Sequence, residues 1–313
     1  MRHAHFGGFS FLGAANVKYQ KPVLTVEQQV EFLISRGMAG DANEMAERLA
    51  TVSYYRLSAY WHPFRQAGTE ALRPGTTFDL VWRRYRFDRE LRLLVMDAVE
   101  RIEVAARTQF TYHHAHAHGA FAYASDPTSL PYLNHARRLA LQESLGREMA
   151  RSKEAFVEHY KRRYAESPCL PIWMATEIMP FGDVVRMITN SDKAVRNAIA
   201  GVFGVPRGIL ESWLLTVGYA RNICAHHGRL WNRVLSVAPA IPRDVAWTQP
   251  VVNGKRTFGL LTICNVCLDR ISPGHRWAKR LAALLDEYAE VPRHAMATPQ
   301  DWRTSSLWAP ALA

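Results

Sequence analysis

One helical pattern, from Phe78 to His118, constrains the fold of this chain more than any other feature. Apolar residues recur along it at the three- and four-residue spacing of a single helix face. That face holds Leu91, Val95, Ala98, Ile102 and Ala105. A helix of this length needs packing partners along its apolar face, because tertiary packing supplies most of a helix's stability. The pattern therefore predicts a helical bundle assembled around this segment.

Helical periodicity also dominates the rest of the sequence. We predict further helices at 26–35, 42–49, 53–61, 135–165, 172–189, 207–225 and 260–289. The segment 239–259 looks irregular, with a short hairpin across Asn253-Gly254. The chain is thus expected to be mainly α. We divide it into a flexible N-terminus (1–20), an N-terminal helical segment packed on the bundle (21–75), the bundle (76–238), an irregular segment with a C-terminal helix (239–291) and a loosely ordered tail (292–313).

The amino-acid composition indicates a globular protein and suggests what kind of partner it binds. A chain of 313 residues that is 48% hydrophobic can bury a large core. Its net charge of +11 favours a polyanionic partner, and its basic residues are mostly arginine, which suits phosphate recognition. A codon bias towards arginine explains that excess equally well. No apolar run reaches the eighteen residues of a membrane span, and the four cysteines lack pairing spacing. We expect a cytoplasmic protein without cofactor or metal.

The residues best suited to chemistry are Arg221, Asn222, His226 and His227. An arginine clamps phosphate oxygens bidentately, and a histidine near its ordinary pKa moves protons at neutral pH. An arginine followed four to six residues later by a histidine should occur by chance about four times in this composition. Three features distinguish the occurrence at Arg221 from such chance matches: the adjacent asparagine, the two consecutive histidines and the polar residues that follow. That continuation contains Arg229, Asn232 and Arg233.

The motif ends an amphipathic run at 207–225. Its apolar stripe holds Ile209, Trp213, Val217, Ala220 and Cys224. Asn222, His226 and Arg229 fall on the opposite face. Arg221 and His226 lie about 140° apart on an ideal helix, so one helix does not bring them together. Either the helix breaks near Gly228, or two copies of the motif face each other in a dimer, and we favour the dimer.

Two other groups of polar residues allow less specific functional interpretations. Glu100, Glu103 and Arg107 line an edge of the long helix, where Glu103 and Arg107 form an i,i+4 pair. These groups either form a solvated salt bridge or orient Arg221 or a motif histidine. The histidines between His113 and His118 are read as a polar, exposed helix end rather than as a metal site.

Several ordered blocks resemble the Abi-like family of bacterial abortive-infection proteins. The blocks are Lys21-Pro22 with Gln28-Gln29-Val30 and Ser35-Arg36-Gly37, Ser53 to Trp61, Tyr85 to Arg92, Glu100 to Thr108, Pro171 to Met174 with Glu177 and Phe181-Gly182, and Arg221 to Arg233. In that family the C-terminal part looks like a HEPN (higher eukaryotes and prokaryotes nucleotide-binding) domain. The resemblance implies a HEPN-like helical bundle with additional N-terminal helices and a C-terminal helical extension.

The same resemblance implies metal-independent RNA cleavage in phage defence. A ribose 2′-hydroxyl would attack the adjacent phosphate and leave a 2′,3′-cyclic phosphate. Arg221 would stabilise the transition state, Asn222 would position His226 or the phosphate, and His226 would carry the proton, with His227 as its partner or replacement. Expected partners are the RNA substrate, a second copy of the chain and an antitoxin RNA or protein. Two alternatives stay open: an RNA- or nucleotide-binding module that does not cut, and a purely structural polar network.

Overall fold

The computed structural model describes residues 22–164, 166–167 and 169–313. The predicted flexible N-terminus at 1–20 lies outside the described residues. The chain divides into two compact units, Met1–Trp82 and Arg83–Ala313. The division between these units falls within the long helix, a few residues after the predicted boundary at residue 75. The predicted C-terminal segments, from residue 239 onwards, belong to the same unit as the bundle.

The first unit contains three helices that local capping signals delimit. They are α1 (Val26–Ser35), α2 (Ala42–Val52) and α3 (Tyr54–Trp61), followed by the 3-10 turn η1 (His62–Phe64). Thr25 and Gln28 form a capping box at the start of α1. Ser53 ends α2 and also caps α3, and its φ of 70° turns the chain sharply between the two helices. Tyr60 and Trp61 are buried, so these two aromatic side chains belong to the core of this unit.

Helix α4 spans Phe78–His118, the range that its periodicity predicts. Four of the five residues in the predicted stripe, Leu91, Val95, Ala98 and Ile102, are fully buried. The fifth, Ala105, is half-buried. The spacing of apolar residues therefore identified correctly which face of this helix contacts the core.

The remaining helices belong to the second unit. They are α5 (Ala122–Ser125), α6 (His135–Arg151), α7 (Ala155–Arg163), α8 (Ile172–Ile178), α9 (Phe181–Asn190), α10 (Lys193–Phe203), α11 (Arg207–Ala225), α12 (Val245–Thr248), α13 (Thr257–Ile271), α14 (Trp277–Glu287) and α15 (Ala309–Leu312), with 3-10 turns η2 (Pro127–Ser129), η3 (Arg293–Met296) and η4 (Trp302–Thr304). The described part of the chain contains isolated β-bridges but no strand. The prediction of a mainly α fold is confirmed.

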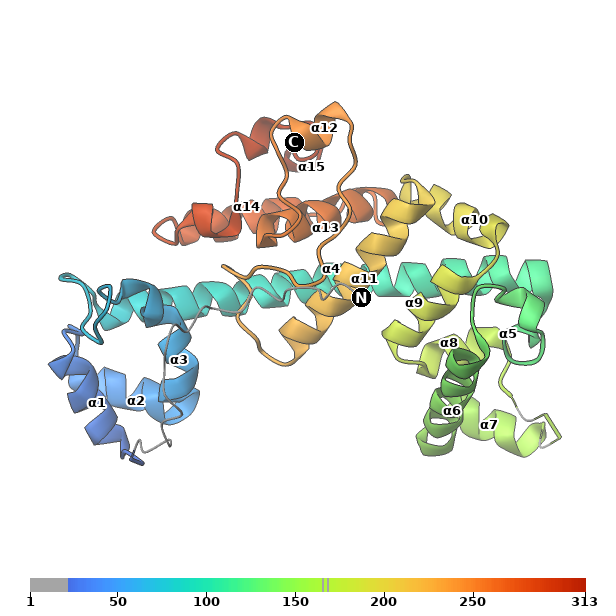
Figure 1. Ribbon diagram of the computed structural model, residues 1–313, viewed down its shortest axis with the longest axis horizontal. Coiled ribbons are helices and arrows are strands. Elements are labelled where there is room, and N and C mark those ends of the chain that lie inside the picture. Colours follow the sequence, from blue (N-terminus) through green and yellow to red (C-terminus); the bar gives the residue numbers. More distant parts are fainter. Residues whose placement is uncertain (1–21, 165, 168) are drawn as a thin grey trace, which may run out of the picture. The chain divides into compact units, whose positions relative to one another are not determined.

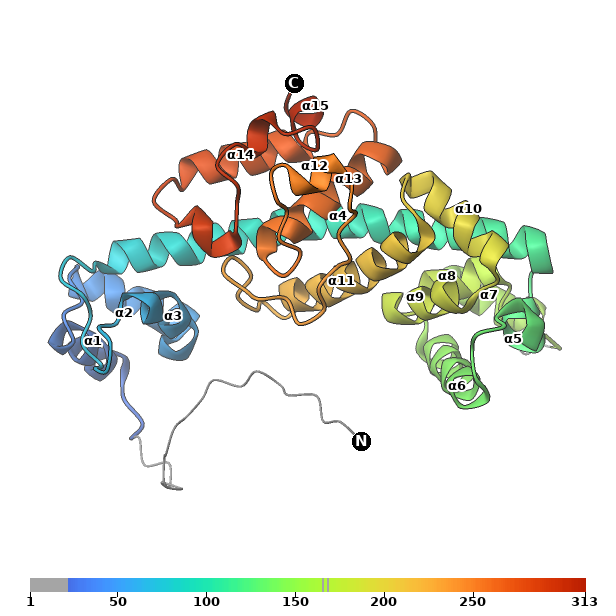
Figure 2. The same cartoon turned by 45° about the horizontal axis from the view of Figure 1, so that its top comes forward.

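The second unit is arranged around α4 (Figures 1 and 2). Helices α13 and α14 lie along its middle, where the Trp277 indole Nε1 donates a hydrogen bond of 2.8 Å to the Leu94 carbonyl. Helices α8 and α9 lie near its carboxyl-terminal end, where Arg107 donates to the Met179 carbonyl at 2.9 Å. Helix α11 packs against α9, α10 and α13. The motif helix is therefore surrounded by packed elements over much of its length.

Three of the predicted long helices are each two helices in the structure. The predicted helix at 135–165 breaks at residues 152–154 between α6 and α7. The one at 172–189 breaks at Pro180, and the one at 260–289 breaks at the Ser272-Pro273-Gly274 turn. Proline lacks an amide donor and obstructs the preceding turn, which explains the latter two breaks. The predicted hairpin across Asn253-Gly254 is also absent: that segment forms only isolated bridges, Val234 to Arg256 and Thr248 to Val251.

The tail after Pro292 is packed, which corrects the prediction of a loosely ordered segment. Trp302 and Trp308 are about 2% and 1% exposed, and both rings contact Phe258 of α13. The Trp308 indole also donates to the Thr262 hydroxyl at 3.3 Å. Two buried indoles hold the last twenty residues against the bundle, so a terminal position alone was a poor guide to order.

No single helix among the described residues is long and apolar enough to cross a membrane. Helices α10 and α11 meet that criterion only when taken together, and they are bent by 73° at the break between them.

Candidate active site at the end of helix α11

Helix α11 carries the motif at its carboxyl end, and its apolar face anchors it in the core. Trp213, Val217, Ala220 and Cys224 are all buried, as the predicted stripe requires. Ile209, the first residue of that stripe, is half-buried. The polar motif side chains lie on the other side of the last turns. A rigidly packed helix is a suitable support for a site, because its backbone cannot shift easily.

The helix ends before His226, and the two histidines form its cap. His226 is the C-cap residue, and His227 adopts a left-handed backbone conformation with φ of 56°. The His227 amide donates to the Cys224 carbonyl at 3.0 Å, and the Gly228 amide donates to the Ile223 carbonyl at 2.8 Å. These two bonds define a Schellman motif, whose left-handed position is usually occupied by glycine. A histidine there carries backbone strain of about 1 kcal/mol or more.

The four candidate residues Arg221, Asn222, His226 and His227 are all exposed. Within the described part of the chain, the side chains of Arg221, Asn222 and His226 make no hydrogen bond or ion pair. The fold therefore fixes the backbone of the motif and leaves these groups accessible to a ligand. The helix break considered near Gly228 is present, slightly earlier than expected. The facing arrangement of two copies involves a partner chain and stays a prediction.

The polar continuation of the motif lies in the loop that follows. Arg229, Asn232 and Arg233 are half-buried, and the Arg233 amide donates to the Leu230 carbonyl at 3.0 Å. Burial raises the pKa of the nearby Cys224 thiol to about 12, against the opposing effect of arginines that include Arg233. Cys224 is therefore a buried core thiol and not a nucleophile.

A buried ion pair on α4, which the sequence analysis did not place in the site, holds this loop. Asp88 is fully buried and Arg92 is about 5% exposed. The Asp88 Oδ1 accepts hydrogen bonds from the amides of Leu230 at 3.0 Å and Trp231 at 2.7 Å. Arg92 Nη1 donates to Asp88 Oδ2 at 2.5 Å and to the Gly228 carbonyl at 3.4 Å. Three of these contacts, from Leu230, Trp231 and Gly228, tie the residues just after the histidines to α4.

The sequence contained a signal for this pair. Asp88 and Arg92 continue the apolar stripe of α4 towards its amino-terminal end, at the three- and four-residue spacing of Leu91 and Val95. A carboxylate on a core-facing stripe needs partners, because an unpaired buried charge is strongly unfavourable. The partners are backbone amides distant in sequence, which no local pattern reveals.

The acidic residues predicted to orient the motif have other roles. Glu103 Oε1 accepts from Arg107 Nη2 at 2.5 Å, and Arg107 also donates to the carbonyls of Thr176 and Met179. This half-buried network joins α4 to the end of α8. Glu100 is exposed. Among the described residues, neither glutamate contacts Arg221 or a motif histidine. Glu103 and Arg107 do form the predicted salt bridge, but the pair is largely shielded from solvent rather than solvated.

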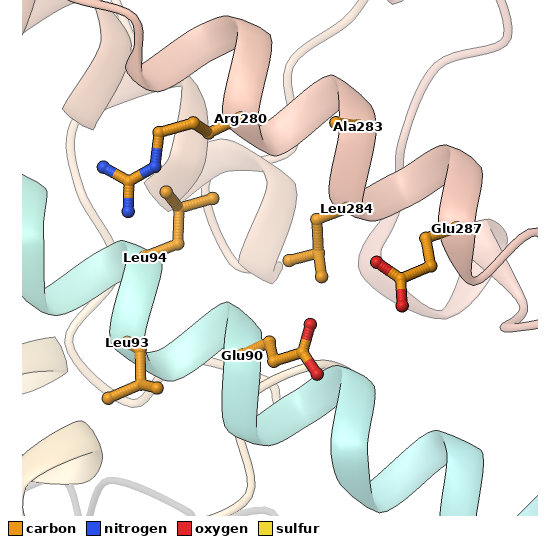
Figure 3. Close-up of a pocket in the computed structure, with 7 residues that line it drawn as sticks. All are labelled: Glu90, Leu93, Leu94, Arg280, Ala283, Leu284 and Glu287. Carbon is orange, nitrogen blue, oxygen red and sulfur yellow. The ribbon is translucent and has the colours of Figure 1, made fainter.

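Two buried cysteines of α13 and a groove between α4 and α14 contain no residue of the motif. Cys264 and Cys267 are buried in α13, and burial raises the pKa of each thiol. The described residues contain no group of three or more histidine, cysteine or acidic side chains that could hold a metal ion. The groove in Figure 3 lies between α4 and α14, with Glu90 and Glu287 near one end and Arg280 at the other. Two of its charged groups already have partners: Glu90 accepts a hydrogen bond from Tyr288 at 2.8 Å, and Arg280 donates to Asp97 at 2.6 Å.

Comparison with known proteins identifies the family. The family model described as Abi-like protein matches residues 47–232, more than half of the chain. The matched range runs from within α2 through the motif to Asn232, and it includes Asp88 and Arg92. No curated protein and no solved structure matches the chain. The family suggests a role in abortive infection. The chain belongs to the Abi-like protein family.

Proposed function

We propose that this protein is a HEPN-type endoribonuclease that cuts RNA without a metal ion, in the cytoplasm of an infected bacterium. The observation that carries the proposal is the accessibility of Arg221, Asn222 and His226 at the end of an otherwise buried helix. Polar side chains that a fold neither buries nor pairs, on a backbone fixed from two sides, are available to a ligand. A purely structural network would instead require these groups to be satisfied within the protein.

The reaction uses the ribose 2′-hydroxyl as the nucleophile. A histidine accepts its proton while the 2′-oxygen forms a bond to phosphorus, and the bond between phosphorus and the 5′-oxygen breaks. A second proton donor protonates that leaving oxygen. The products are a 2′,3′-cyclic phosphate and a 5′-hydroxyl. Arg221 stabilises the negative charge that develops on the non-bridging oxygens, and Asn222 positions the phosphate or His226. Arg229, Asn232 and Arg233 bind the neighbouring RNA backbone.

Two protons move in this reaction, and the chain offers two adjacent histidines. His226 and His227 divide the roles of general base and general acid within one chain or across a homodimer. In the homodimer, which the angle of about 140° between Arg221 and His226 on an ideal helix suggested, each phosphate would contact residues from two copies. Because α11 ends at Ala225, that angle does not describe the folded chain, and the arrangement within one chain stays open. In abortive infection such an activity must be restrained until a trigger arrives, and an antitoxin RNA or protein would provide that restraint.

Growth arrest and RNA integrity in cells provide the test. Wild type is expressed beside Arg221→Ala, His226→Ala and the matched surface controls Arg147→Ala and His135→Ala, with folding checked by thermal melts. We expect wild type and controls to arrest growth and fragment RNA, and both motif variants to do neither. If folded wild type binds RNA through the motif but never cuts it, the chain is a binding module. If both motif variants unfold, the motif is structural.

A further inference from the structure

The two histidines of the motif lie between two fixed points of the backbone. Upstream, the Schellman bonds join the amides of His227 and Gly228 to the last turn of α11. Downstream, Asp88 accepts the amides of Leu230 and Trp231. The stretch between these anchors is only a few residues long, and it includes the left-handed backbone of His227. Because so short a segment has few alternatives, its two ends fix the backbone from which the imidazoles project.

The downstream anchor, in which Asp88 binds the amides of Leu230 and Trp231, is reinforced by further contacts. The Leu230 carbonyl accepts from the Thr257 hydroxyl at 2.7 Å, so the same peptide that donates to α4 also contacts α13. Arg92 neutralises the carboxylate of Asp88 and donates to the Gly228 carbonyl. The Gly228 position is also sterically tight, since an added Cβ would lie 3.2 Å from Ile223 Cγ2. The charged pair is thus directed at the main chain of the motif loop.

We propose that Asp88 and Arg92 are the positioning residues of the candidate site: they hold the loop after α11 so that His226 and His227 are presented to the scissile phosphate. The inference rests on the proposed function for its catalytic consequence. Neither residue touches the substrate, because both are buried beneath the loop. Catalysis depends on small displacements, and a misplacement of about 1 Å lowers a rate by roughly 100-fold.

A second ion pair on the same helix provides a matched control. Asp97 and Arg101 have the same i,i+4 spacing on α4, with a contact of 2.9 Å, and Asp97 also pairs with Arg280 of α14. This pair is partly exposed and contacts no residue of the motif loop. Asp97→Asn therefore removes a carboxylate from α4 without altering the anchor of the histidines. Asp88→Asn keeps the size of the side chain but replaces one acceptor oxygen with a donor that faces Arg92.

The experiment measures RNA cleavage and local hydrogen exchange in the full chain, well below its melting temperature. We expect Asp88→Asn to lower kcat by roughly 10- to 100-fold with little change in KM, since the residue acts on geometry and not on binding. Amide exchange across residues 226–233 should accelerate in this variant. Asp97→Asn should leave kcat and exchange in that segment unchanged. If Asp88→Asn does not fold, Arg92→Gln, which retains a donor but no charge, should give the same two changes to a smaller extent.

The outcomes separate this inference from the proposed function. If wild type cleaves RNA and a folded Asp88→Asn variant retains full kcat, the positioning role is wrong. A lower melting temperature with unchanged kcat and unchanged exchange at 226–233 would also overturn it, because that is the signature of a merely structural ion pair. If wild type does not cleave RNA, the proposed function fails. The exchange measurement then decides alone: acceleration confined to 226–233 in Asp88→Asn supports the anchor, and no acceleration contradicts it.

Discussion

Two helices of this protein end in clusters of histidine, and the fold treats the two clusters in opposite ways. At the end of α4, His114 is fully buried and His118 Nε2 lies 2.7 Å from Asp192 Oδ2. At the end of α11, His226 and His227 are exposed, and the hydrogen bonds there involve backbone amides. His114 of the first cluster is part of the core, whereas both histidines of the second are presented to solvent. The difference shows which histidines are available for chemistry.

The α4 cluster also corrects an expectation. The sequence predicted a polar, exposed helix end at His113–His118. His116 is indeed exposed, but His114 is buried, and neither of its ring nitrogens has a hydrogen-bond partner in the described residues. Burial, with the neighbouring His118, lowers the pKa of His114 from 6.5 to about 4. A histidine held neutral in an apolar site behaves as an aromatic core residue. Local composition did not reveal this, because burial of the helix end depends on distant segments.

Removal of the motif side chains should produce the largest effect on function and almost none on stability. We expect Arg221→Ala or His226→Ala to reduce RNA cleavage by roughly 100- to 10,000-fold, since each removes charge stabilisation or proton transfer. The free energy of unfolding should change by no more than about 0.5 kcal/mol, because both side chains are exposed. Initial rates and urea denaturation measure the two quantities. If either motif variant lost as much stability as a core mutation, the motif would be part of the packed structure, and the contrast between the end of α4 and the end of α11 would not hold.

The opposite pattern is expected at His114. His114→Ala should lower the free energy of unfolding by about 2–4 kcal/mol through the cavity it leaves, with cleavage retained wherever the variant is folded. Thermal and urea denaturation test the first part, and cleavage assays at low temperature test the second. Cleavage lost from a folded, stable His114→Ala variant would mean that this cluster also takes part in the chemistry.

His114 should also make stability depend on pH. Its pKa is lower in the folded state than in the unfolded state, so the unfolded chain binds the extra proton between pH 6.5 and 4. Stability is therefore complete above pH 6.5 and falls as the pH drops towards 4, by about 2–3 kcal/mol. His114→Phe should flatten this part of the profile. His118 and Asp192 also face this ring, so Asp192→Asn serves as the control that separates their contribution.

The smallest expected change in stability is that of His227→Gly, which tests the backbone conformation of the motif. Glycine adopts the left-handed conformation of His227 without strain, so His227→Gly should leave stability unchanged or raise it by up to about 1 kcal/mol. Cleavage should fall if the His227 imidazole transfers a proton, and should persist if His226 suffices. Unfolding midpoints and cleavage rates of the same preparation give both answers. A marked loss of stability would show that the imidazole of His227 is needed by the fold.

The sequence predicted long regular features better than interruptions. The bounds of α4 follow from its periodicity, because a stripe sustained over forty residues leaves little ambiguity. The breaks at Pro180 and at Pro273-Gly274 were missed, although proline and glycine mark such interruptions. The packing of the C-terminal tail was missed because isolated tryptophans do not form the repeating apolar pattern that predicts a buried helix face. Burial of Trp302 and Trp308 depends on an apolar face of α13 distant in sequence.

The sequence named the residues of the candidate site, whose role stays a prediction, but it did not reveal their geometry. The apolar stripe of α11 correctly placed Asn222 and His226 on the side of the helix end that is exposed, whereas Arg229 is half-buried. The end of the helix before His226 and the anchoring of the following loop were not predictable, because the hydrogen bonds from Leu230 and Trp231 reach across the fold to Asp88. The expectation that Glu103 orients the motif failed for a related reason: Arg107, which pairs with Glu103, is itself held by the carbonyls of Thr176 and Met179 at the end of α8.

The most direct test of the central claim uses an RNA oligonucleotide and purified wild-type protein in the presence of a metal chelator. The cleavage position is mapped first, and the 2′-hydroxyl at that one nucleotide is then replaced by hydrogen. We predict cleavage of the all-RNA strand to a 2′,3′-cyclic phosphate and a 5′-hydroxyl, both identified by mass spectrometry, and no cleavage at the modified position. Cleavage at the modified position, or products that carry a 5′-phosphate, would contradict a mechanism in which the ribose is the nucleophile at the end of α11.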